Sequence, residues 1–484
     1  MKKPLLLSLL TVITLACNSE IREFEPDLSD RNLHPLEAYL ANRDTSLVYE
    51  EIKVLENDSY TAYVIRMESG KWQPTGDRWW HYLTVVIPEA ADQSTSLIYI
   101  GGGSTSSDIP ETANEIAVGA AERTGSVTAY LHNVPFQPAQ FLDDPSGSLR
   151  SEDDLIAYGW RRFMEEGAGD EDTEWLSRLP MTRAVVQAMD IVTEFTRLKS
   201  GPEIENFVVS GASKRGWTAW TTAIFDDRVI AVAPAVIDLL NITPSFLHHW
   251  RALGEWSPAI ADYSRENIME WLGTPEFDRL MELTDPYSYL DEFDKPVYLI
   301  NAASDEFFLP DSWQFYWDEL PRTKAIRYIP NSGHSISNSD AFQSLTSFYQ
   351  HILTDTELPE FVWTVSDSGF TLQYDPARIP DEIYLWNAHN PDSRDFRLYV
   401  IDRIWLASRV DADPSGSLFI PIETPEAGFT AWFAEAIFHS ESFEPFTVTT
   451  GVKILPDIYL HEEFKPNRNL INRTFSETNP VISE

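Results

Sequence analysis

The sequence predicts an α/β protein whose mostly parallel sheet is followed by a C-terminal all-β unit. Between residues 34 and 356, short apolar runs alternate with amphipathic helical patterns, which is typical of parallel strands joined by right-handed crossover helices. Residues 239–293 break this alternation with helical, aromatic-rich sequence. From residue 357 the pattern changes to period two, with turns rich in Pro, Asp, Ser and Gly, which favours an immunoglobulin-like sandwich.

Length and composition limit the class of protein. The chain has 484 residues, 43% hydrophobic and 23% charged, so a globular protein of two domains is expected. The formal net charge of −40 repels phosphate backbones and anionic lipids, so neither nucleic-acid binding nor an electrostatic hold on membranes is expected. The 16 Trp fit either large aromatic cores or a substrate cleft lined with rings, and composition does not separate the two.

The first 17 residues resemble a bacterial lipoprotein signal peptide. Lys2 and Lys3 precede an apolar stretch, residues 5–15, that is too short to span a bilayer. Cys17, the only cysteine, follows a small residue directly after that stretch. We expect lipidation at Cys17, an acidic tether over residues 18–33, and a lipoprotein of the bacterial cell envelope that faces the periplasm or the surface. An ordinary secretory signal with a chance cysteine is the alternative, and a single cysteine allows no intramolecular disulfide.

Periodicity orders the elements of the expected α/β domain, residues 34–356. Helical patterns occur at residues 34–43, 153–165 and 180–199. Strands are expected where β-branched and aromatic residues gather, at residues 49–55, 60–66, 79–87, 97–100 and 125–131. This part of the chain therefore supplies both strands and crossover helices to one sheet.

The segment around Ser213 predicts a strand, a tight turn and a helix. Residues 207–209 are apolar and β-branched, and residues 214–225 have one apolar helical face. A serine at such a turn is similar to the nucleophile elbow of α/β-hydrolases, in which the hydroxyl is exposed at the carboxyl edge of the sheet. The elbow pattern is G-x-S-x-G, whereas here Gly216 comes one residue late and Arg215 stands in the glycine position. An ordinary turn before a buried helix is the alternative.

Three glycines and a serine, residues 101–104, directly follow the expected strand at residues 97–100. Consecutive glycines indicate backbone freedom or a close approach. In α/β-hydrolases the loop at this place supplies one amide of the oxyanion hole, and the residue after the nucleophile supplies another. The expected oxyanion donors are therefore the amides of Lys214, Gly102, Gly103 and Ser104, with a merely flexible loop as the alternative.

Two more chemically active side chains follow predicted strands. Residues 296–301 end close to Asp305, and residues 325–329 end close to His334. In a parallel sheet such strand ends meet at one edge, and the chain order Ser, Asp, His is that of α/β-hydrolases. A serine needs a base to take its proton and an acid to orient that base, so we expect Ser213, His334 and Asp305 to act together.

Each of these roles has an alternative. Asp238, which closely follows the apolar run 229–236, is a rival for the acid. Asp305 also suits a helix or turn cap, and His334 follows Ser-Gly and suits a turn. Helices are expected at residues 311–320 and 340–354.

The insertion, residues 239–293, is expected to form a helical cap over the site. It contains the substrate-cleft candidates His248, His249, Trp250 and Trp256. Adjacent histidines on a helix do not face one ion, and the sequence has no zinc-type Cys/His set and no phosphate-binding fingerprint. No metal and no cofactor are therefore expected.

Residues 357–460 are expected to form the β-sandwich, and residues 461–484 a polar tail. Strands are predicted at residues 361–365, 370–374, 382–387, 398–400, 417–420, 429–438 and 446–455. No catalytic cluster occurs in this part of the sequence.

The chain resembles the PhoPQ-activated pathogenicity-related proteins in several long motifs. They include SGASKRGWTAW at the elbow, SLIYIGGGS at the glycine loop, PSFLHHWRALGEWSPAIADY in the insertion, and NAASDEFFLPDSWQFY and RYIPNSGHS farther on. The resemblance covers roughly residues 36 to 455. It implies a secreted α/β-hydrolase-like fold with an appended β domain, the nucleophile at Ser213, the acid at Asp305 and the base at His334, but no defined substrate. The elbow is also similar to that of glucuronoyl esterases, in which a basic residue follows the serine.

Two functions of different kinds follow from these patterns. The first is a secreted, lipid-anchored serine hydrolase that cleaves an ester bond in a small-molecule, glycan-ester or peptide substrate, with peptidase activity as the runner-up. The second is a non-catalytic binding or interaction protein of the envelope, which the irregular elbow favours. Membrane contact is expected only through the lipid anchor, and no nucleic-acid partner is expected.

Overall fold

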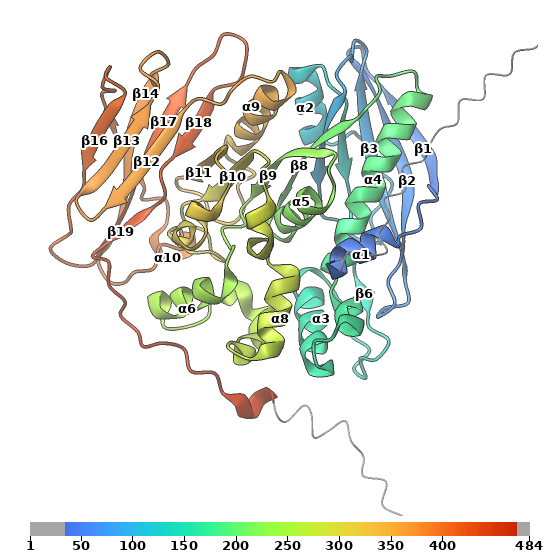
Figure 1. Cartoon of the computed structure of the whole chain (residues 1–484), viewed down its shortest axis with the longest axis horizontal. Helices are drawn as coiled ribbons and strands as arrows, with labels where there is room; N and C mark the ends of the chain where they lie inside the picture. Colours follow the sequence, from blue (N-terminus) through green and yellow to red (C-terminus); the bar gives the residue numbers. More distant parts are fainter. Residues whose placement is uncertain (1–33, 472–484) are drawn as a thin grey trace, which may run out of the picture. The chain divides into compact units, whose positions relative to one another are not determined.

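A nine-stranded mixed sheet is the central element of the structure, a computed structural model that describes residues 34–471 (Figure 1). The first three strands are antiparallel: β1 Tyr49–Glu56, β2 Tyr60–Lys71 and β3 Arg78–Pro88. The strands beyond them are parallel to one another: β5 Thr128–Leu131, β4 Thr95–Ile100, β8 Asn206–Ala212, β9 Val229–Ala235, β10 Val297–Ala302 and β11 Lys324–Ile329. Their spatial order is β1-β2-β3-β5-β4-β8-β9-β10-β11. The predicted α/β class is therefore confirmed.

Two pairs of helices cover the sheet. On one face, α4 Arg178–Leu198 packs with α5 Lys214–Phe225, and on the other α2 Glu115–Thr124 packs with α9 Ala341–Leu353. Every residue of β10 is buried, as is usual for a parallel strand with helices on both sides. The sequence does not predict α2, because its small residues form no strong apolar stripe. Asn114 caps its first turn and Gly125 ends it with a φ of 67°.

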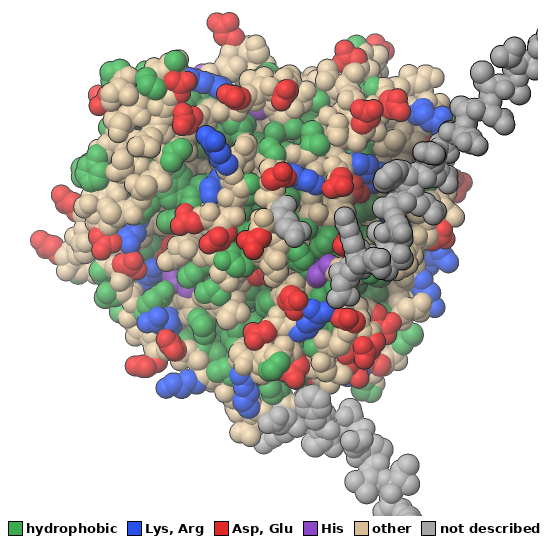
Figure 2. All heavy atoms as spheres, viewed as in Figure 1, with side chains coloured by type: hydrophobic (Ala, Val, Ile, Leu, Met, Phe, Trp, Pro, Cys, Tyr) green, Lys and Arg blue, Asp and Glu red, His purple; other side chains and the backbone are tan. Residues whose placement is uncertain are grey.

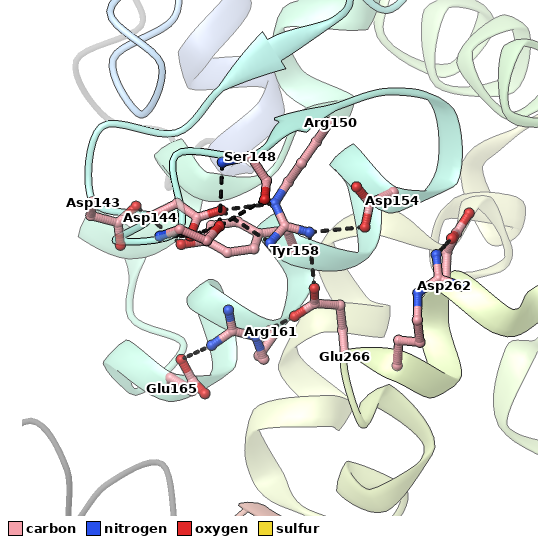
Figure 3. Close-up of polar contacts among 12 residues, drawn as sticks. Asp143, Asp144, Ser148, Arg150, Asp154, Tyr158, Arg161, Glu165, Asp262 and Glu266 are labelled. Atoms are coloured by element: carbon pink, nitrogen blue, oxygen red, sulfur yellow. Dashed lines mark hydrogen bonds and ion pairs between the residues drawn. The ribbon is translucent and has the colours of Figure 1, made fainter.

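A helical insertion joins β9 to β10, as the sequence predicts. It consists of α6 Ile242–Leu253, α7 Ala261–Arg265, α8 Pro275–Thr284 and three 3-10 turns, Pro258–Ile260, Ile268–Trp271 and Pro286–Glu292. Ion pairs hold it against α3 Glu152–Glu166 and against Arg150 just before that helix. Glu266, after α7, accepts from Arg150 at 3.0 Å and from Arg161 at 2.5 Å, and the Arg150 guanidinium lies over the Tyr158 ring (Figure 3).

Smaller elements complete the α/β part of the chain. They are α1 Pro35–Ala41, the two-stranded pair β6 Ala139–Gln140 and β7 Leu149–Arg150, and the 3-10 turn Asp170–Trp175. Residues 311–320, predicted to be one helix, form two 3-10 turns instead, Ser312–Phe315 and Trp317–Glu319. Between them Tyr316 takes a φ of −149°, which ends the first turn and directs the phenol to Asp238.

The C-terminal segment forms two antiparallel sheets. One contains β12 Phe361–Ser366, β13 Gly369–Tyr374 and β16 Ser417–Pro421. The other contains β15 Leu406–Val410, β14 Glu382–Asn390, β17 Phe429–Phe438, β18 Phe446–Thr449 and β19 Lys453–Leu455. The all-β character of this segment agrees with the sequence, and its immunoglobulin-like topology stays a prediction.

Two strand predictions in this segment need correction. The predicted strand at residues 398–400 is a short helix, α10 Leu398–Ile401, because the Leu398 amide donates to the Ser304 carbonyl of the α/β part and not to a neighbouring strand. The predicted strand at residues 446–455 is divided into β18 and β19. Between the two strands, the Thr450 amide donates to the Ala434 carbonyl and the Thr450 hydroxyl donates to the Gly451 carbonyl. Gly451 lies so close to the Trp313 indole that a Cβ atom there would overlap it.

The β segment covers the β11 edge of the central sheet. The Tyr298 hydroxyl donates to the Thr447 carbonyl, and the Tyr328 amide donates to the Thr449 hydroxyl at 3.0 Å. Apolar residues of both parts belong to one continuous core. Acidic side chains lie scattered over the face drawn in Figure 2. Within residues 34–471, no helix combines the length and the apolar character that crossing a bilayer requires. Cys17, the tether and the end of the polar tail lie outside the described residues.

Candidate active site

Ser213 occupies a sharp turn between β8 and α5. Its φ of 57° and ψ of −129° lie in a region that non-glycine residues rarely adopt, which costs about 1–3 kcal/mol and recurs at functional sites. A Cβ atom on Gly211 would lie 2.8 Å from the Arg215 carbonyl oxygen, and one on Gly216 would lie 2.8 Å from Ile237. Gly216 is therefore the position at which α5 packs closely against the segment after β9. Residue 215 makes no such approach and does not need to be glycine.

Asp305 and His334, which follow β10 and β11, are hydrogen-bonded. His334 Nδ1 lies 2.9 Å from Asp305 Oδ2 and 3.0 Å from Oδ1. Asp305 is buried, and its Oδ1 also accepts from the amides of Phe307 and Phe308. The Phe307 ring lies 4.2 Å from the imidazole, centroid to centroid. This arrangement orients the ring and leaves Nε2 as its remaining proton acceptor.

Phe307 and Phe308 connect the surroundings of Ser213 and His334. Ser213, nine-tenths buried, lines a pocket together with Phe307 and Phe308, and both of these rings contact the imidazole. Among the contacts of residues 34–471, no hydrogen bond joins the Ser213 hydroxyl to His334. Hydrogen bonds of this kind are often long without substrate and tighten when it binds.

Asp238, the rival acid, lies in a separate polar cluster. Its two carboxyl oxygens accept from the phenols of Tyr316 and Tyr328, the latter at 2.6 Å. Burial raises the pKa of Asp238 to about 8, against the opposing effect of these two hydrogen bonds. Asp238 is therefore largely protonated at neutral pH, and no hydrogen bond joins it to His334 within residues 34–471.

The four expected oxyanion donors have different contacts in the structure. Ser104 is the least suitable, because its amide already donates to the Ser107 hydroxyl at 3.2 Å. Gly102 lies against α5, since a Cβ atom there would come within 2.8 Å of the Arg215 guanidinium. Gly103 has a φ of 148° and its carbonyl accepts from Gln137. Lys214, whose amide begins α5, lines the same pocket as Ser213.

Glu152 connects the start of α5 to the glycine loop through Gln137, which also donates to the Gly103 carbonyl. Oε1 of Glu152 accepts from Arg215 and from Gln137, both at 2.6 Å, and its Oε2 lies 2.9 Å from Lys214 Nζ. Burial disfavours its ionisation, but Arg215 and Lys214 outweigh burial and lower the pKa of Glu152 to about 2. Sequence patterns do not single out Glu152, because it is one of several acidic residues at the start of a helix.

We name the pocket beside Ser213 the elbow pocket. It encloses about 40 Å³, and aromatic and polar side chains surround it, namely Asp153, Trp160, Lys214, Trp217, Phe246, His249, Tyr263 and Phe307. At its polar end Tyr263 donates to Asp153 at 3.0 Å, and Asp153 lies 3.1 Å from Lys214 Nζ. Trp160 and Trp217 were not expected here, because their spacing on helices is that of ordinary core residues.

Only one of the four cleft candidates lines the elbow pocket. His249 does, and burial lowers its pKa to about 3 while its Nε2 accepts from the Ser257 amide. His248 instead bonds Asp311 at 2.9 Å and Tyr459 at 2.8 Å. Trp250 and Trp256 pack on Phe464. His248, His249 and Trp250 differ because α6 turns adjacent side chains to different sides, whereas Trp256 lies beyond the end of this helix.

The C-terminal segment braces both loops of the site. Trp405 donates from its indole to the Ser304 hydroxyl, next to Asp305, at 2.9 Å. Its backbone exchanges two hydrogen bonds with the Asn331 side chain, three residues before His334, at 2.9 and 3.1 Å. The sequence gives no signal for this contact, because the partners lie 74 and 101 residues apart.

Within residues 34–471, no group of three or more His, Cys, Asp or Glu side chains is arranged to hold a metal ion.

Comparisons with known proteins place the chain among relatives. The model of the PhoPQ-activated pathogenicity-related protein family matches residues 36–397. Autocrine proliferation repressor protein A of Dictyostelium discoideum is 35% identical over 427 residues, which are 83% of this chain and 85% of that protein. Two acetyl xylan esterase structures are similar at lower identity. The enzyme from a Thermoanaerobacterium species is 17% identical with a TM-score of 0.44, over 62% of this chain and 87% of that one. The enzyme from a Paenibacillus species is 14% identical with a TM-score of 0.46, over 64% and 92%.

Proposed function

This chain belongs to the PhoPQ-activated pathogenicity-related protein family, and we propose that it is a serine hydrolase that cleaves an ester bond through Ser213, His334 and Asp305. The observation that carries the proposal is the Asp305–His334 hydrogen bond beyond the ends of β10 and β11, together with the strained backbone of Ser213 beyond β8 of the same sheet. A strained serine, an oriented imidazole and a buried carboxylate are the parts that serine hydrolysis requires.

The proposed mechanism assigns one step to each group. His334 Nε2 takes the Ser213 proton while Oγ attacks the carbonyl carbon, and the resulting imidazolium returns the proton to the leaving oxygen. Asp305 holds the Nδ1 proton and stabilises the imidazolium. The amides of Lys214 and of Gly102 or Gly103 stabilise the oxyanion, and a donor of this kind is worth about 10²–10³ in rate. Water then attacks the acyl-enzyme with the same base.

An ester is preferred to an amide. Alcohols leave more readily than amines, so an ester needs less proton donation from the imidazolium to its leaving group. Peptidase activity is the runner-up and would use the same three side chains.

A fluorophosphonate probe tests the proposal directly. The wild-type chain should be labelled at Ser213, and Ser213→Ala and His334→Ala should not be labelled while circular dichroism shows an intact fold. Ser415→Ala, an exposed serine in a turn of the β segment, is the matched control and should be labelled as wild type is. Equal labelling of wild type and Ser213→Ala would remove the assignment.

Lipidation at Cys17 and residence in the cell envelope are further parts of this proposal. The apolar stretch before the single cysteine supports them. Metabolic labelling with a fatty-acid analogue should tag the full chain and not Cys17→Ser. Detergent-free release of the wild-type chain from cells would argue against an anchor.

The second candidate is a non-catalytic binding protein on the same scaffold. The absence of a Ser213–His334 hydrogen bond within the described residues favours it, and so does the relative whose name describes a repressor of proliferation. A folded wild-type chain that no fluorophosphonate labels and that hydrolyses no ester would support this candidate.

A further inference from the structure

His334 borders a second, much larger cavity, which we name the histidine pocket. It encloses about 900 Å³, and its walls come from α2, α9 and the sheet face between them, including Tyr99, Ile116, His132, Ile300, His334 and Leu345. The elbow pocket, about 40 Å³, is lined by different residues, which include Ser213 and Lys214. The site is therefore open to two compartments of very different size.

The lining of the histidine pocket is mainly apolar. Ile116, Ile300 and Leu345 line it, together with the polar rings of His132 and Tyr99. Burial lowers the pKa of His132 to about 4 and raises that of Tyr99 to about 12, so both are neutral at neutral pH. Exposed Glu111 and Glu115 lie at the rim, which disfavours an anionic occupant.

The mechanism of serine hydrolysis determines whether the acyl group or the alcohol of an ester lies in each of the two pockets. The histidine gives its proton to the leaving oxygen, so the leaving group lies on the histidine side. The oxyanion donor next to the serine holds the carbonyl oxygen, so the acyl group lies on the serine side. His334 lines the large pocket, whereas Ser213 and Lys214 line the small one.

We propose that the substrate is an ester of a short acyl group with a bulky, uncharged, largely apolar alcohol, the acyl group in the elbow pocket and the alcohol in the histidine pocket. This inference rests on the proposed function. The elbow pocket, at about 40 Å³, holds a much smaller group than the histidine pocket, at about 900 Å³. The histidine pocket accepts a leaving group of several rings.

Three aryl esters test whether the acyl group and the alcohol occupy the two pockets as proposed: phenyl acetate, 2-naphthyl acetate and 2-naphthyl octanoate. For the wild-type chain, kcat/KM should be higher for naphthyl acetate than for phenyl acetate, and roughly tenfold or more lower for naphthyl octanoate than for naphthyl acetate. Equal rates for octanoate and acetate, or a preference for the phenyl leaving group, would overturn the assignment.

Two substitutions address the pockets separately. Ile116→Trp narrows the histidine pocket and should lower the ratio of naphthyl to phenyl acetate turnover roughly tenfold. Ile379→Trp, an exposed position in the β segment, is the matched control and should leave this ratio unchanged. Phe246→Leu enlarges the elbow pocket and should raise the ratio of octanoate to acetate turnover. An effect of Ile116→Trp on acyl length and not on the leaving group would overturn the assignment.

A binding measurement separates failure of this inference from failure of the proposed function. The fluorescence of 2-naphthol should report saturable binding to Ser213→Ala, and binding should weaken in Ser213→Ala/Ile116→Trp. Such binding without any ester hydrolysis by wild type would remove the catalytic proposal and keep the alcohol site. Hydrolysis by Ser213 with no 2-naphthol binding would remove the alcohol site and keep the catalytic proposal.

Discussion

His334 Nδ1 lies 2.9 Å from Asp305 Oδ2, although the two residues are 29 positions apart and follow different strands. The contact exists because β10 and β11 are adjacent and parallel, so the loops after them leave the sheet at the same edge. Asp238 follows β9, the next strand of the sheet, yet its carboxyl bonds two tyrosines. Geometry therefore favours Asp305 over Asp238 as the acid.

Asp305→Asn should lower kcat for an aryl acetate by about 10⁴-fold, because an amide in place of the carboxylate no longer fixes the His334 tautomer. Asp238→Asn should leave kcat nearly unchanged. Steady-state hydrolysis of both purified variants against wild type makes the comparison. A greater loss from Asp238→Asn would assign the acid role to Asp238.

Asp238→Asn should instead change how stability depends on pH. Burial raises the pKa of Asp238 in the folded chain from 3.8 to about 8. Between these two pH values the folded state keeps the carboxyl proton and the unfolded state does not. The stabilisation that this proton gives the folded state is therefore complete below about pH 4 and is lost as the pH rises towards 8. The free energy of unfolding of wild type minus that of the variant should fall by up to about 1.4 kcal/mol per pH unit in this window.

Urea unfolding between about pH 5 and pH 8 measures this difference. Asp375→Asn, at an exposed turn carboxylate, is the control and should give a curve parallel to that of wild type. Parallel curves for Asp238→Asn and wild type would show that Asp238 does not titrate in this range.

Glu152→Gln should lower kcat roughly 10-fold to 100-fold with little change in KM. Glutamine keeps the shape of the side chain but loses the charge that joins Lys214 and Arg215 to the glycine loop, so the oxyanion donors lose their relative position. Rates of hydrolysis and of fluorophosphonate labelling should fall together.

Glu166→Gln is the control for this variant. Glu166 lies on the same helix and pairs with Arg162, but it is exposed and distant from the glycine loop contacts. It should behave as wild type. A change in KM alone for Glu152→Gln would indicate a role in substrate binding and not in positioning the loop.

Trp405→Phe should lower both stability and kcat. The substitution leaves the buried Ser304 hydroxyl without its indole donor, which costs about 1–3 kcal/mol, and it loosens the loop that carries Asp305. Urea unfolding and steady-state kinetics on the same preparation separate the two effects.

Trp386→Phe is the matched control, because the Trp386 ring, like that of Trp405, contacts Phe433 and its indole also donates a hydrogen bond, in this case to Glu435. It should lose stability without losing kcat. If both variants retained wild-type kcat, the C-terminal segment would have only a stabilising role.

Much of the scaffold could be predicted from the sequence, because its signals are local. Apolar β-branched runs marked the central strands, and the small residues around Ser213 marked the turn. The prediction failed where a residue's environment lies far along the chain. α10 forms because the Leu398 amide bonds Ser304, and residues 311–320 break into turns because Tyr316 reaches Asp238.

Some parts of the candidate site could likewise be predicted from the sequence, and others could not. The positions of Ser213, Asp305 and His334 at strand ends follow from local pattern and chain order. The walls of the pockets do not, since Trp160 and Trp217 have the spacing of core residues until α3 and α5 are seen to face one cavity. No local sequence pattern indicates the roles of Glu152 and Trp405 either, because each depends on a contact with a residue 63 or 101 positions away, respectively.

The sequence alone determined the α/β class, a tight turn at Ser213 and the chain order of Ser213, Asp305 and His334, because each depends on neighbours within a few residues. Only the tertiary structure decided that Asp305 and not Asp238 bonds His334, that a carboxylate joins the glycine loop to α5, and that two unequal cavities border the site. Those outcomes depend on which strand ends and helix faces meet when the sheet folds, and no local pattern encodes such distant contacts.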